Sequence, residues 1–192
     1  INPLTTNTNT PTLTGTASLG AGESLSVTLN NVTYTIENGL TVDAGNWSLS
    51  IPSGNALTEG AYEVTATVTD GAGNASIDTS SNEIVIDTTA PTAPSINPLT
   101  TNTTTPILTG TATLGVGESL SVLVNGVSYT TENGLSIDSS NWSLTIPSSN
   151  ALAEGTYEVT ATVTDVAGNA TSDTSSNEIV IDTTAPTVPS IN

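Results

Sequence analysis

Hydrophobic and polar residues alternate strictly along short stretches of this chain. Leu25, Val27 and Leu29 alternate with serine and threonine, and Tyr62, Val64, Ala66 and Val68 do the same with glutamate and threonine. An alternation with a period of two places every second side chain on the same face of a strand and is typical of half-buried β-strands. No stretch shows helical spacing, so the pattern predicts an all-β protein.

Seven such stretches occur in the first half of the chain. They lie near residues 1–4, 12–17, 24–29, 32–42, 47–51, 61–69 and 83–87. Seven short strands separated by turn residues fit an immunoglobulin-like β-sandwich. Two features stay open: Glu37-Asn38-Gly39 interrupts the fourth strand, where we expect a bulge of unassigned role, and Tyr62 is either a tyrosine corner or an ordinary core residue.

The whole pattern occurs twice. Residues 1–95 align with residues 96–190 without a gap, and roughly three quarters of the aligned positions are identical. We therefore expect two tandem sandwiches of about seven strands each, arranged end to end. We expect the first repeat to span residues 1–90 and the second 91–186, with a linker at about 87–95 and the start of a third repeat at 187–192. We therefore expect the chain to be a piece of a longer array.

The charge of the chain narrows the range of functions. It contains 18 acidic residues and no Lys, Arg or His, which gives a net charge of −18. This charge argues against binding nucleic acid or an anionic membrane surface, and no apolar stretch is long enough to insert into a membrane. Without His, Cys, Lys or Arg the usual general bases, nucleophiles and oxyanion ligands are absent. We expect no enzyme; glycoside hydrolysis by two carboxylates is the one reaction type that the composition leaves open.

Four sequence motifs resemble a known family. They are VTDGAGN at 68–74, GNWSLSIP at 45–52, EGAYEVTATVTD at 59–70 and the linker DTTAPTAPS at 87–95. In this order they resemble the bacterial Ig-like extender repeats of giant RTX and biofilm-associated surface adhesins, over both copies and the linker. The resemblance implies a secreted, extracellular stalk on a bacterial cell surface that projects a distal ligand-binding region. Several members of that family use calcium at domain junctions to stiffen the rod.

The strand order also predicts where the acidic loop residues gather. Three loops should lie at the end of the sandwich that holds its N-terminus, whereas the last strand leaves at the opposite end. In the first copy these three loops carry Glu23, Asp43, Asp70, Asn74 and Asp78, and the last strand ends at Asp87. Their counterparts in the second copy are Glu118, Asp138, Asp165, Asn169, Asp173 and, at the end of the last strand, Asp182.

In a tandem array Asp87 would meet the acidic loops of the next repeat. No basic side chain is available to neutralise such a cluster. A calcium ion takes six to eight oxygen ligands in a flexible geometry, which suits a site built from loops. We therefore predict Ca²⁺ at the junction, with the residues named above as candidate ligands. The competing interpretation is that Asp and Asn at 43–46 and 70–74 only form turns, because their side chains bond the local backbone.

The prediction for the function is a structural extender module, rigidified by calcium, whose partners are neighbouring repeats of the same chain in a monomeric rod. The alternative is an adhesive module that contacts a carbohydrate, ice or another cell through a threonine-rich face or the loop tips. That face would carry Thr33, Thr35, Thr65, Thr67 and Thr69. Threonine also favours strands and serves as an uncharged solvent face, so its abundance alone does not decide between the two.

Overall fold

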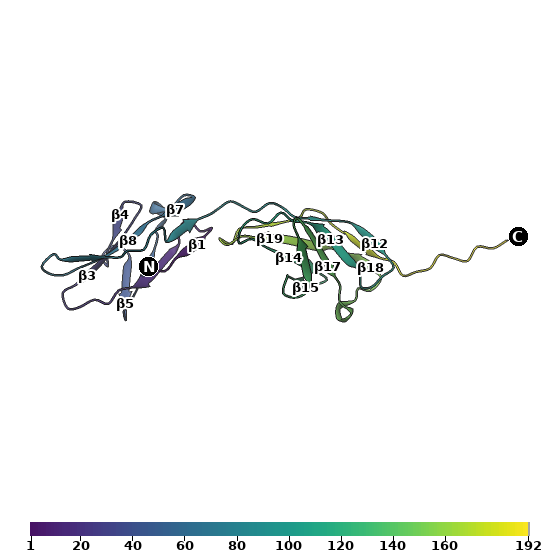
Figure 1. The fold of residues 1–192 in the computed structure, drawn as a ribbon, viewed down its shortest axis with the longest axis horizontal. Coiled ribbons are helices and arrows are strands. Elements are labelled where there is room, and N and C mark those ends of the chain that lie inside the picture. The colour runs from purple at the N-terminus through teal and green to yellow at the C-terminus, as the bar shows by residue number, and fades with distance from the viewer. Residues whose placement is uncertain (192) are drawn as a thin grey trace. The chain divides into compact units, whose positions relative to one another are not determined.

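A computed structural model describes residues 1–191 and divides the chain into two compact units, Ile1–Thr89 and Ala90–Asn192 (Figure 1). Both units consist of short strands, and the prediction of two immunoglobulin-like sandwiches is confirmed. The helical content of the described residues is limited to two 3₁₀ turns, η1 (Ser53–Asn55) and η2 (Ser148–Asn150). Neither turn is long or apolar enough to cross a membrane.

Unit 1 contains ten strands. Their bounds are β1 Leu4–Thr6, β2 Thr12–Thr16, β3 Ser24–Leu29, β4 Val32–Tyr34, β5 Leu40–Asp43, β6 Asn46–Ser50, β7 Gly60–Tyr62, β8 Val64–Thr69, β9 Ala75–Ile77 and β10 Ile84–Ile86. They form three hydrogen-bonded groups, in the orders β1-β10-β7, β2-β6-β5 and β4-β3-β8-β9. The pairing of β1 with β10 is parallel, and the others are antiparallel.

Unit 2 repeats this arrangement with one addition. Its strands are β11 Ser95–Ile96, β12 Leu99–Thr101, β13 Ile107–Thr111, β14 Ser119–Val124, β15 Val127–Tyr129, β16 Leu135–Asp138, β17 Asn141–Thr145, β18 Gly155–Tyr157, β19 Val159–Thr164, β20 Ala170–Ser172 and β21 Ile179–Ile181. The added strand, β11, pairs with β13 in the order β11-β13-β17-β16. The end of the predicted linker is therefore part of a sheet of unit 2.

Each unit has its own hydrophobic core, built from the inward-facing residues of the alternating pattern. In unit 1 the core contains Leu25, Val27 and Leu29 of β3 together with Trp47 and Leu49 of β6. The register places Gly15 directly opposite Trp47. A Cβ atom on this glycine would lie 2.6 Å from the indole ring, so the large ring packs here only because its neighbour has no side chain.

The fourth predicted strand, residues 32–42, is two strands in the structure. β4 belongs to one sheet and β5 to another, so the chain crosses between sheets where we expected a bulge. Asn38 holds the corner: its side-chain amide donates to the Thr33 carbonyl oxygen at 3.0 Å, and its side-chain oxygen accepts from the Thr35 N–H. Gly39 follows with a φ of 120°, a conformation that favours glycine. The segment Glu37-Asn38-Gly39 therefore turns the chain from the sheet of β4 to the sheet of β5.

Two other local expectations are resolved. The Tyr62 hydroxyl donates to the Thr58 carbonyl oxygen at 2.9 Å, four residues upstream, as in a tyrosine corner. The predicted strand 61–69 is interrupted at Glu63, where the chain passes from the sheet of β7 to the sheet of β8. The additional strand β9, which pairs with β8, was not expected because residues 75–77 show no clear alternation.

Candidate functional site

Asp70 folds the loop between β8 and β9 around its own carboxylate. One carboxylate oxygen accepts from the N–H groups of Ala72 and Asn74, both at 2.9 Å, and the other accepts from the Asn74 side chain at 2.8 Å. The Asn74 side-chain bond, followed by the backbone bonds, holds the pKa of Asp70 below its usual value. The side chains of Asp70 and Asn74 are thus brought together, as a turn within one unit.

Asp165 and Asn169 form the same turn in unit 2. The Asn169 N–H and side-chain amide donate to the Asp165 carboxylate, each at 2.8 Å. Burial favours the neutral form of Asp165 and is the largest single influence on it, but the hydrogen bonds from Asn169 outweigh burial. The pKa of Asp165 is therefore lowered. The carboxylate is kept charged by its own loop.

The other predicted ligands of the loops also contact nearby backbone or hydroxyl groups. Glu23 accepts from the Gly20 N–H at 2.7 Å, and Glu118 accepts from the Gly115 N–H at 2.8 Å. Asp78 accepts from Ala66 N–H (2.7 Å) and Ser80 (2.8 Å), Asp173 from Ala161 N–H (2.8 Å) and Ser175 (2.7 Å), Asp138 from Ser139 (3.4 Å), Asp87 from Thr89 N–H (3.0 Å) and Asp182 from Thr184 N–H (3.0 Å). Asp43 lies at the end of β5, in register with Asn46.

The donors present are carboxylate and amide oxygens, which are the hard ligands that calcium prefers. Over residues 1–191, however, no three acidic side chains lie close enough together to hold a metal ion. Each unit by itself brings together one carboxylate and one amide, in the pairs Asp70–Asn74 and Asp165–Asn169. Calcium at the junction therefore stays a prediction.

Glu83 and Glu178 are the buried acidic residues of the described chain, and the sequence analysis did not predict a role for them. Their side chains are 4% and 3% exposed. Glu83 accepts from the Val64 N–H at 3.1 Å, and Glu178 accepts from the Val159 N–H at 3.0 Å. Val64 and Val159 directly follow Glu63 and Glu158, the residues at which the chain passes from one sheet to the other. In both glutamates the second carboxylate oxygen, Oε1, is buried without a hydrogen-bond partner among the described residues.

A second carboxylate completes this contact from the opposite side. Glu63 accepts from the Asn82 N–H at 2.9 Å, while Glu83 accepts from the Val64 N–H, so residues 63–64 and 82–83 are bonded reciprocally. The Glu83 carbonyl oxygen also accepts from the Leu4 N–H at 2.8 Å. We call this arrangement the reciprocal glutamate lock. It connects β1, the start of β8 and the residues directly before β10. Unit 2 repeats it at 158–159 and 177–178.

Glu59 fixes the start of the linker to unit 1. Its carboxylate accepts from the hydroxyls of Thr88 at 2.8 Å and Thr89 at 2.9 Å, and these bonds lower the pKa of Glu59. At the other end of the linker, the Trp142 indole N–H donates to the Ser95 carbonyl oxygen at 3.0 Å within unit 2. Only residues 90–94 therefore lie between anchored positions, and two of these five residues are proline.

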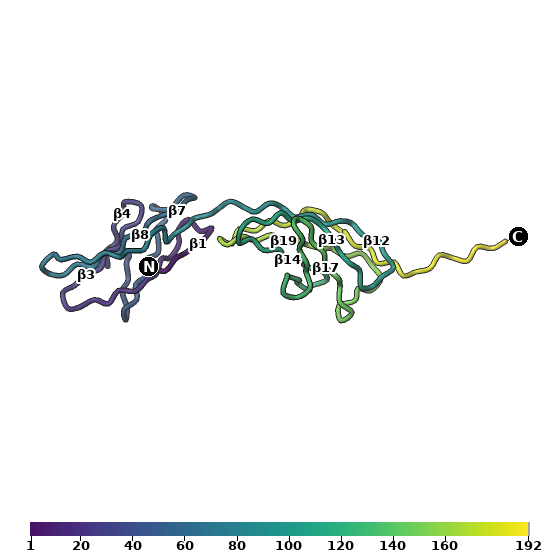
Figure 2. The backbone as a smooth tube through the Cα atoms, in the orientation of Figure 1, coloured from purple at the N-terminus to yellow at the C-terminus, as the bar shows by residue number. Residues whose placement is uncertain are grey.

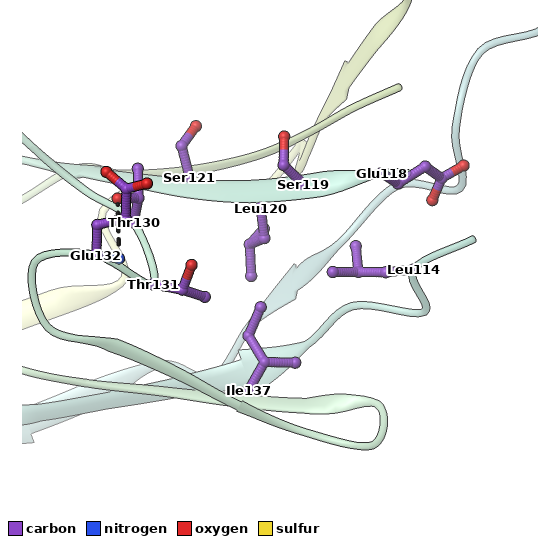
Figure 3. A pocket seen from close by; sticks show the side chains of 9 residues that line it. All are labelled: Leu114, Glu118, Ser119, Leu120, Ser121, Thr130, Thr131, Glu132 and Ile137. Atoms are coloured by element: carbon purple, nitrogen blue, oxygen red, sulfur yellow. Dashed lines mark hydrogen bonds between the residues drawn. The ribbon is translucent and has the colours of Figure 1, made fainter. Parts of the chain in front are cut away.

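A groove occurs at the same open edge in both units. In unit 1 its volume is about 590 Å³ and in unit 2 about 380 Å³. Figure 3 shows Leu114, Leu120 and Ile137 pointing into the groove of unit 2, whereas Ser119 and Ser121 point away from it. β15 pairs only with the second half of β14, from Val122 to Val124, which leaves the first half without a strand partner on that side.

A scan of family models matches the chain twice, over residues 3–88 and 93–183, with the bacterial Ig-like domain. The chain belongs to the bacterial Ig-like domain family. Comparison with curated protein sequences gives no match.

Solved structures similar to this pair of bacterial Ig-like domains include domains of titin and part of a bacterial adhesin. Domains A168–A170 of titin align with a TM-score of 0.51 at 8% identity, covering 93% of this chain and 62% of that chain. A structure described as concerning host cell surface retention of a 1.5-MDa bacterial ice-binding adhesin aligns with a TM-score of 0.42 at 22% identity, covering 91% and 59%. The titin domains Z1Z2, solved with telethonin, align at 0.33 and 16% identity, covering 94% of each. Identities this low show a shared fold alone.

Proposed function

We propose that the chain is a structural extender of a large bacterial cell-surface adhesin, located outside the cell, in which repeats of one polypeptide form a stalk. The observation that carries this proposal is the anchoring of the linker at both ends. Glu59 fastens Thr88 and Thr89 to unit 1, and Trp142 fastens Ser95 to unit 2. A linker that is held at both ends and contains two prolines limits the angles available to successive repeats.

The near-identity of the two units supports the same function. A stalk needs interchangeable repeats, whereas a binding module needs one unit with a distinctive loop. The glutamate lock, the Asp70 turn and the groove all recur in unit 2 at aligned positions. Neither unit has an inserted loop.

Calcium is the second part of the proposal. It would be held by Asp87 together with Glu118, Asp138, Asp165, Asn169 and Asp173, and would supply positive charge to a group of acids that has no basic partner. The proposal draws on acids from two adjoining repeats, because no three acidic side chains of residues 1–191 lie close enough together within one unit to hold a metal ion. The chain's own contribution is to hold the Asp165 carboxylate charged, through the Asn169 bonds.

Small-angle scattering of the full chain, in calcium and then in EDTA, tests this function. We expect a longer, stiffer particle in calcium and a broader distribution of shapes after chelation. Asp87→Ala should give the chelated profile even in calcium, while both units stay folded. Superimposable profiles in the two conditions would refute calcium stiffening; a wide distribution of shapes in both would refute the stalk.

The recurring groove favours adhesive binding as a second candidate function. Its apolar floor and its rim, which includes Glu23 and Glu37 in unit 1, could receive part of a glycan or an extended peptide. The threonine-rich face supports this candidate less, because Thr28, whose hydroxyl bonds Thr33 at 3.0 Å, is replaced by Leu123 in unit 2. Adhesive binding can be tested by screening the full chain against soluble glycans and for ice binding. If neither assay detects binding, this candidate is refuted and the stalk remains as the proposed function.

A further inference from the structure

Strand β3 has a partner on one side along its whole length, but on the other side only along half of it. It pairs with β8 over all six of its residues, whereas β4 ends at the pair Val27–Tyr34. In unit 2, β14 lies beside β19 throughout, and its pairing with β15 ends at Val122–Tyr129 (Figure 2). The first half of each strand is therefore a sheet edge, and such an edge can pair with another strand.

The backbone of Leu25 supplies the hydrogen-bonding groups of this edge in unit 1. Leu29 and Val32 flank the two-residue turn Asn30-Asn31, so they form a hydrogen-bonded pair. Because the direction of the backbone groups repeats every two residues, the N–H and carbonyl of Leu25 point to the same side as those of Leu29. Leu120 has the equivalent place in β14. Among the described residues, no strand pairs with either of these two leucines on this side.

The groove described above runs along this open edge. The same nine aligned positions line it in both units, and seven of them carry the same residue. Its floor contains Leu25 or Leu120, which are only 4% and 3% exposed, and in unit 1 also the half-buried Leu19 and Val42. Residues opposite each other in paired strands project their side chains to the same face. A strand residue added opposite Leu25 would therefore place its side chain on this apolar floor.

A glutamate lies at each end of the groove. Figure 3 shows Glu118 and Glu132 on opposite sides of the apolar residues of unit 2. Glu23 and Glu37 have the same positions in the groove of unit 1. The chain contains no Lys or Arg that could neutralise these carboxylates. A ligand with a positive charge on each side of an apolar centre therefore complements the groove in charge as well as in polarity.

These features distinguish between possible ligands of the groove. A second copy of this chain brings only further carboxylates to the four glutamates, and like charges repel. None of the nine lining residues in either unit is aromatic, so a sugar finds no flat ring on which to stack. An extended peptide, in contrast, pairs with the backbone groups of a sheet edge and fills adjacent pockets with alternate side chains. A basic extended peptide therefore fits the edge, the floor and the ends of the groove.

We propose that each groove binds an extended peptide in which one apolar side chain has a Lys or Arg on both sides, within two residues. The peptide backbone pairs with Leu25 or Leu120 as an added strand, and the apolar side chain enters the floor of the groove. The two basic side chains reach the glutamates at the ends. The proposal goes beyond the stalk function and shares only its site with the second candidate function, because a peptide ligand requires neither a glycan nor ice.

The groove of unit 1 should bind such a peptide more tightly than the groove of unit 2. Its volume is about 590 Å³ against about 380 Å³, and it is lined by Ile36 where unit 2 has Thr131. Ile36 is 72% exposed and is therefore available to cover an apolar side chain in the groove, which buries further apolar surface. Ile36→Thr should lower the affinity of unit 1 toward that of unit 2.

Titration of a capped peptide into the full ¹⁵N-labelled chain tests the proposal by NMR. The peptide Lys-Thr-Ile-Thr-Lys is added in EDTA, so that calcium does not contribute. We expect the backbone amide signals of Leu25 and Leu120 to shift until they saturate, with Leu25 saturating first. The capped peptides Glu-Thr-Ile-Thr-Glu and Lys-Thr-Gly-Thr-Lys should each bind roughly tenfold more weakly, because one lacks the positive charges and the other lacks the apolar side chain. Equal binding of all three peptides would overturn the proposal.

Two matched pairs of substitutions separate the groove from the net charge of the chain. Glu23→Gln with Glu37→Gln should weaken binding in unit 1 by roughly three- to tenfold and leave unit 2 unchanged as an internal control. Glu59→Gln with Glu63→Gln removes the same charge from unit 1 outside the groove and should leave both affinities unchanged. All four glutamates are exposed, and glutamine keeps a hydrogen-bond acceptor, so the fold is retained. An equal loss of affinity in both pairs would contradict the assignment.

Soluble glycans added in the same NMR experiment distinguish a failure of this inference from a failure of the second candidate function. A glycan that shifts the Leu25 and Leu120 signals, while the lysine peptide does not, would overturn the peptide ligand and support adhesive binding through a sugar. If neither ligand shifts these signals, the groove is not a binding site for either class. Shifts caused by the lysine peptide alone are the expected result.

Discussion

The two kinds of carboxylate in this protein contribute to it in opposite ways. Asp70 and Asp165 lie in end loops, and each is surrounded by N–H donors of its own turn. Glu83 and Glu178 lie in the core, where one oxygen accepts a backbone N–H and the other has no partner among residues 1–191. The loop acids shape local turns through hydrogen bonds between residues close together in the sequence. The buried acids join strands that are far apart in the sequence.

This difference shows how a chain without cations manages its negative charge. A charged group in the core would ordinarily be paired with a basic residue, and none exists here. In this protein the buried acids accept hydrogen bonds from backbone N–H groups instead. The donors are the N–H groups of Val64 and Val159, which would otherwise lack an acceptor where the chain passes between sheets. The buried glutamates replace a missing strand partner.

The largest expected effect comes from removing a buried glutamate. Glu83→Ala leaves the Val64 N–H buried without an acceptor, and we expect unit 1 to lose about 1–3 kcal/mol of unfolding free energy. Urea unfolding followed by near-ultraviolet circular dichroism measures the loss. Glu83→Gln keeps an acceptor without the charge and should unfold close to the parent protein. Equal losses in both variants would show that the charge itself, rather than the acceptor, is required.

The exposed half of the reciprocal glutamate lock should matter less. Glu63→Ala removes the bond to the Asn82 N–H, but this N–H then reaches water, so we expect a loss of about 0.5–1.5 kcal/mol. Glu158→Ala in unit 2 is the matched test of the same contact. If either variant were as destabilising as Glu83→Ala, the distinction between buried and exposed carboxylates would fail.

The smallest expected effect is the pH dependence that the loop acids cause. The pKa values of Glu59, Asp70, Glu154 and Asp165 are lowered in the folded protein by hydrogen bonds from neighbouring threonine and asparagine residues. A lowered folded pKa contributes stability above the unfolded pKa, and this stability is lost as the pH falls through the folded pKa. Thermal melting should therefore show acid destabilisation.

Replacing two of these acids isolates their share of the pH effect. Asp70→Asn with Asp165→Asn should flatten the acid side of the melting-temperature profile relative to the parent chain. Protonation also relieves repulsion among the acids, which acts in the opposite direction. An unchanged acid slope in the double variant would show that these two turns do not contribute.

Much of the fold follows from the hydrophobic alternation. The strand at 24–29 has the bounds predicted for it, and Asn30-Asn31 adopts the positive φ values of a two-residue hairpin. The change of sheet after Tyr34 could not be read from the sequence, because Leu40 and Val42 continue an alternating pattern whichever sheet they join. Only tertiary pairing decides between a bulge and a crossing.

The site was less accessible to sequence reasoning. The sequence Asp70-Gly-Ala-Gly-Asn74 indicates both a turn and a source of ligands, and its turn geometry follows from local chemistry. Glu83 gave no signal: it directly precedes the strand of Ile84 and Ile86, at a position that the alternation assigns to the solvent-facing side. Its burial depends on Val64, which is distant in sequence. The repeat at Glu178 added no information, since the two copies agree nearly everywhere.

We propose that loop acids of adjoining repeats hold calcium. Calorimetric titration of calcium into the full chain tests it most directly, with magnesium and the Asp87→Ala variant as controls. We predict saturable binding with a dissociation constant of about 0.1–1 mM, as in extracellular modules, weaker binding of magnesium, and weaker calcium binding in the variant. No binding heat, together with the same melting temperature in calcium and in EDTA, would contradict the claim.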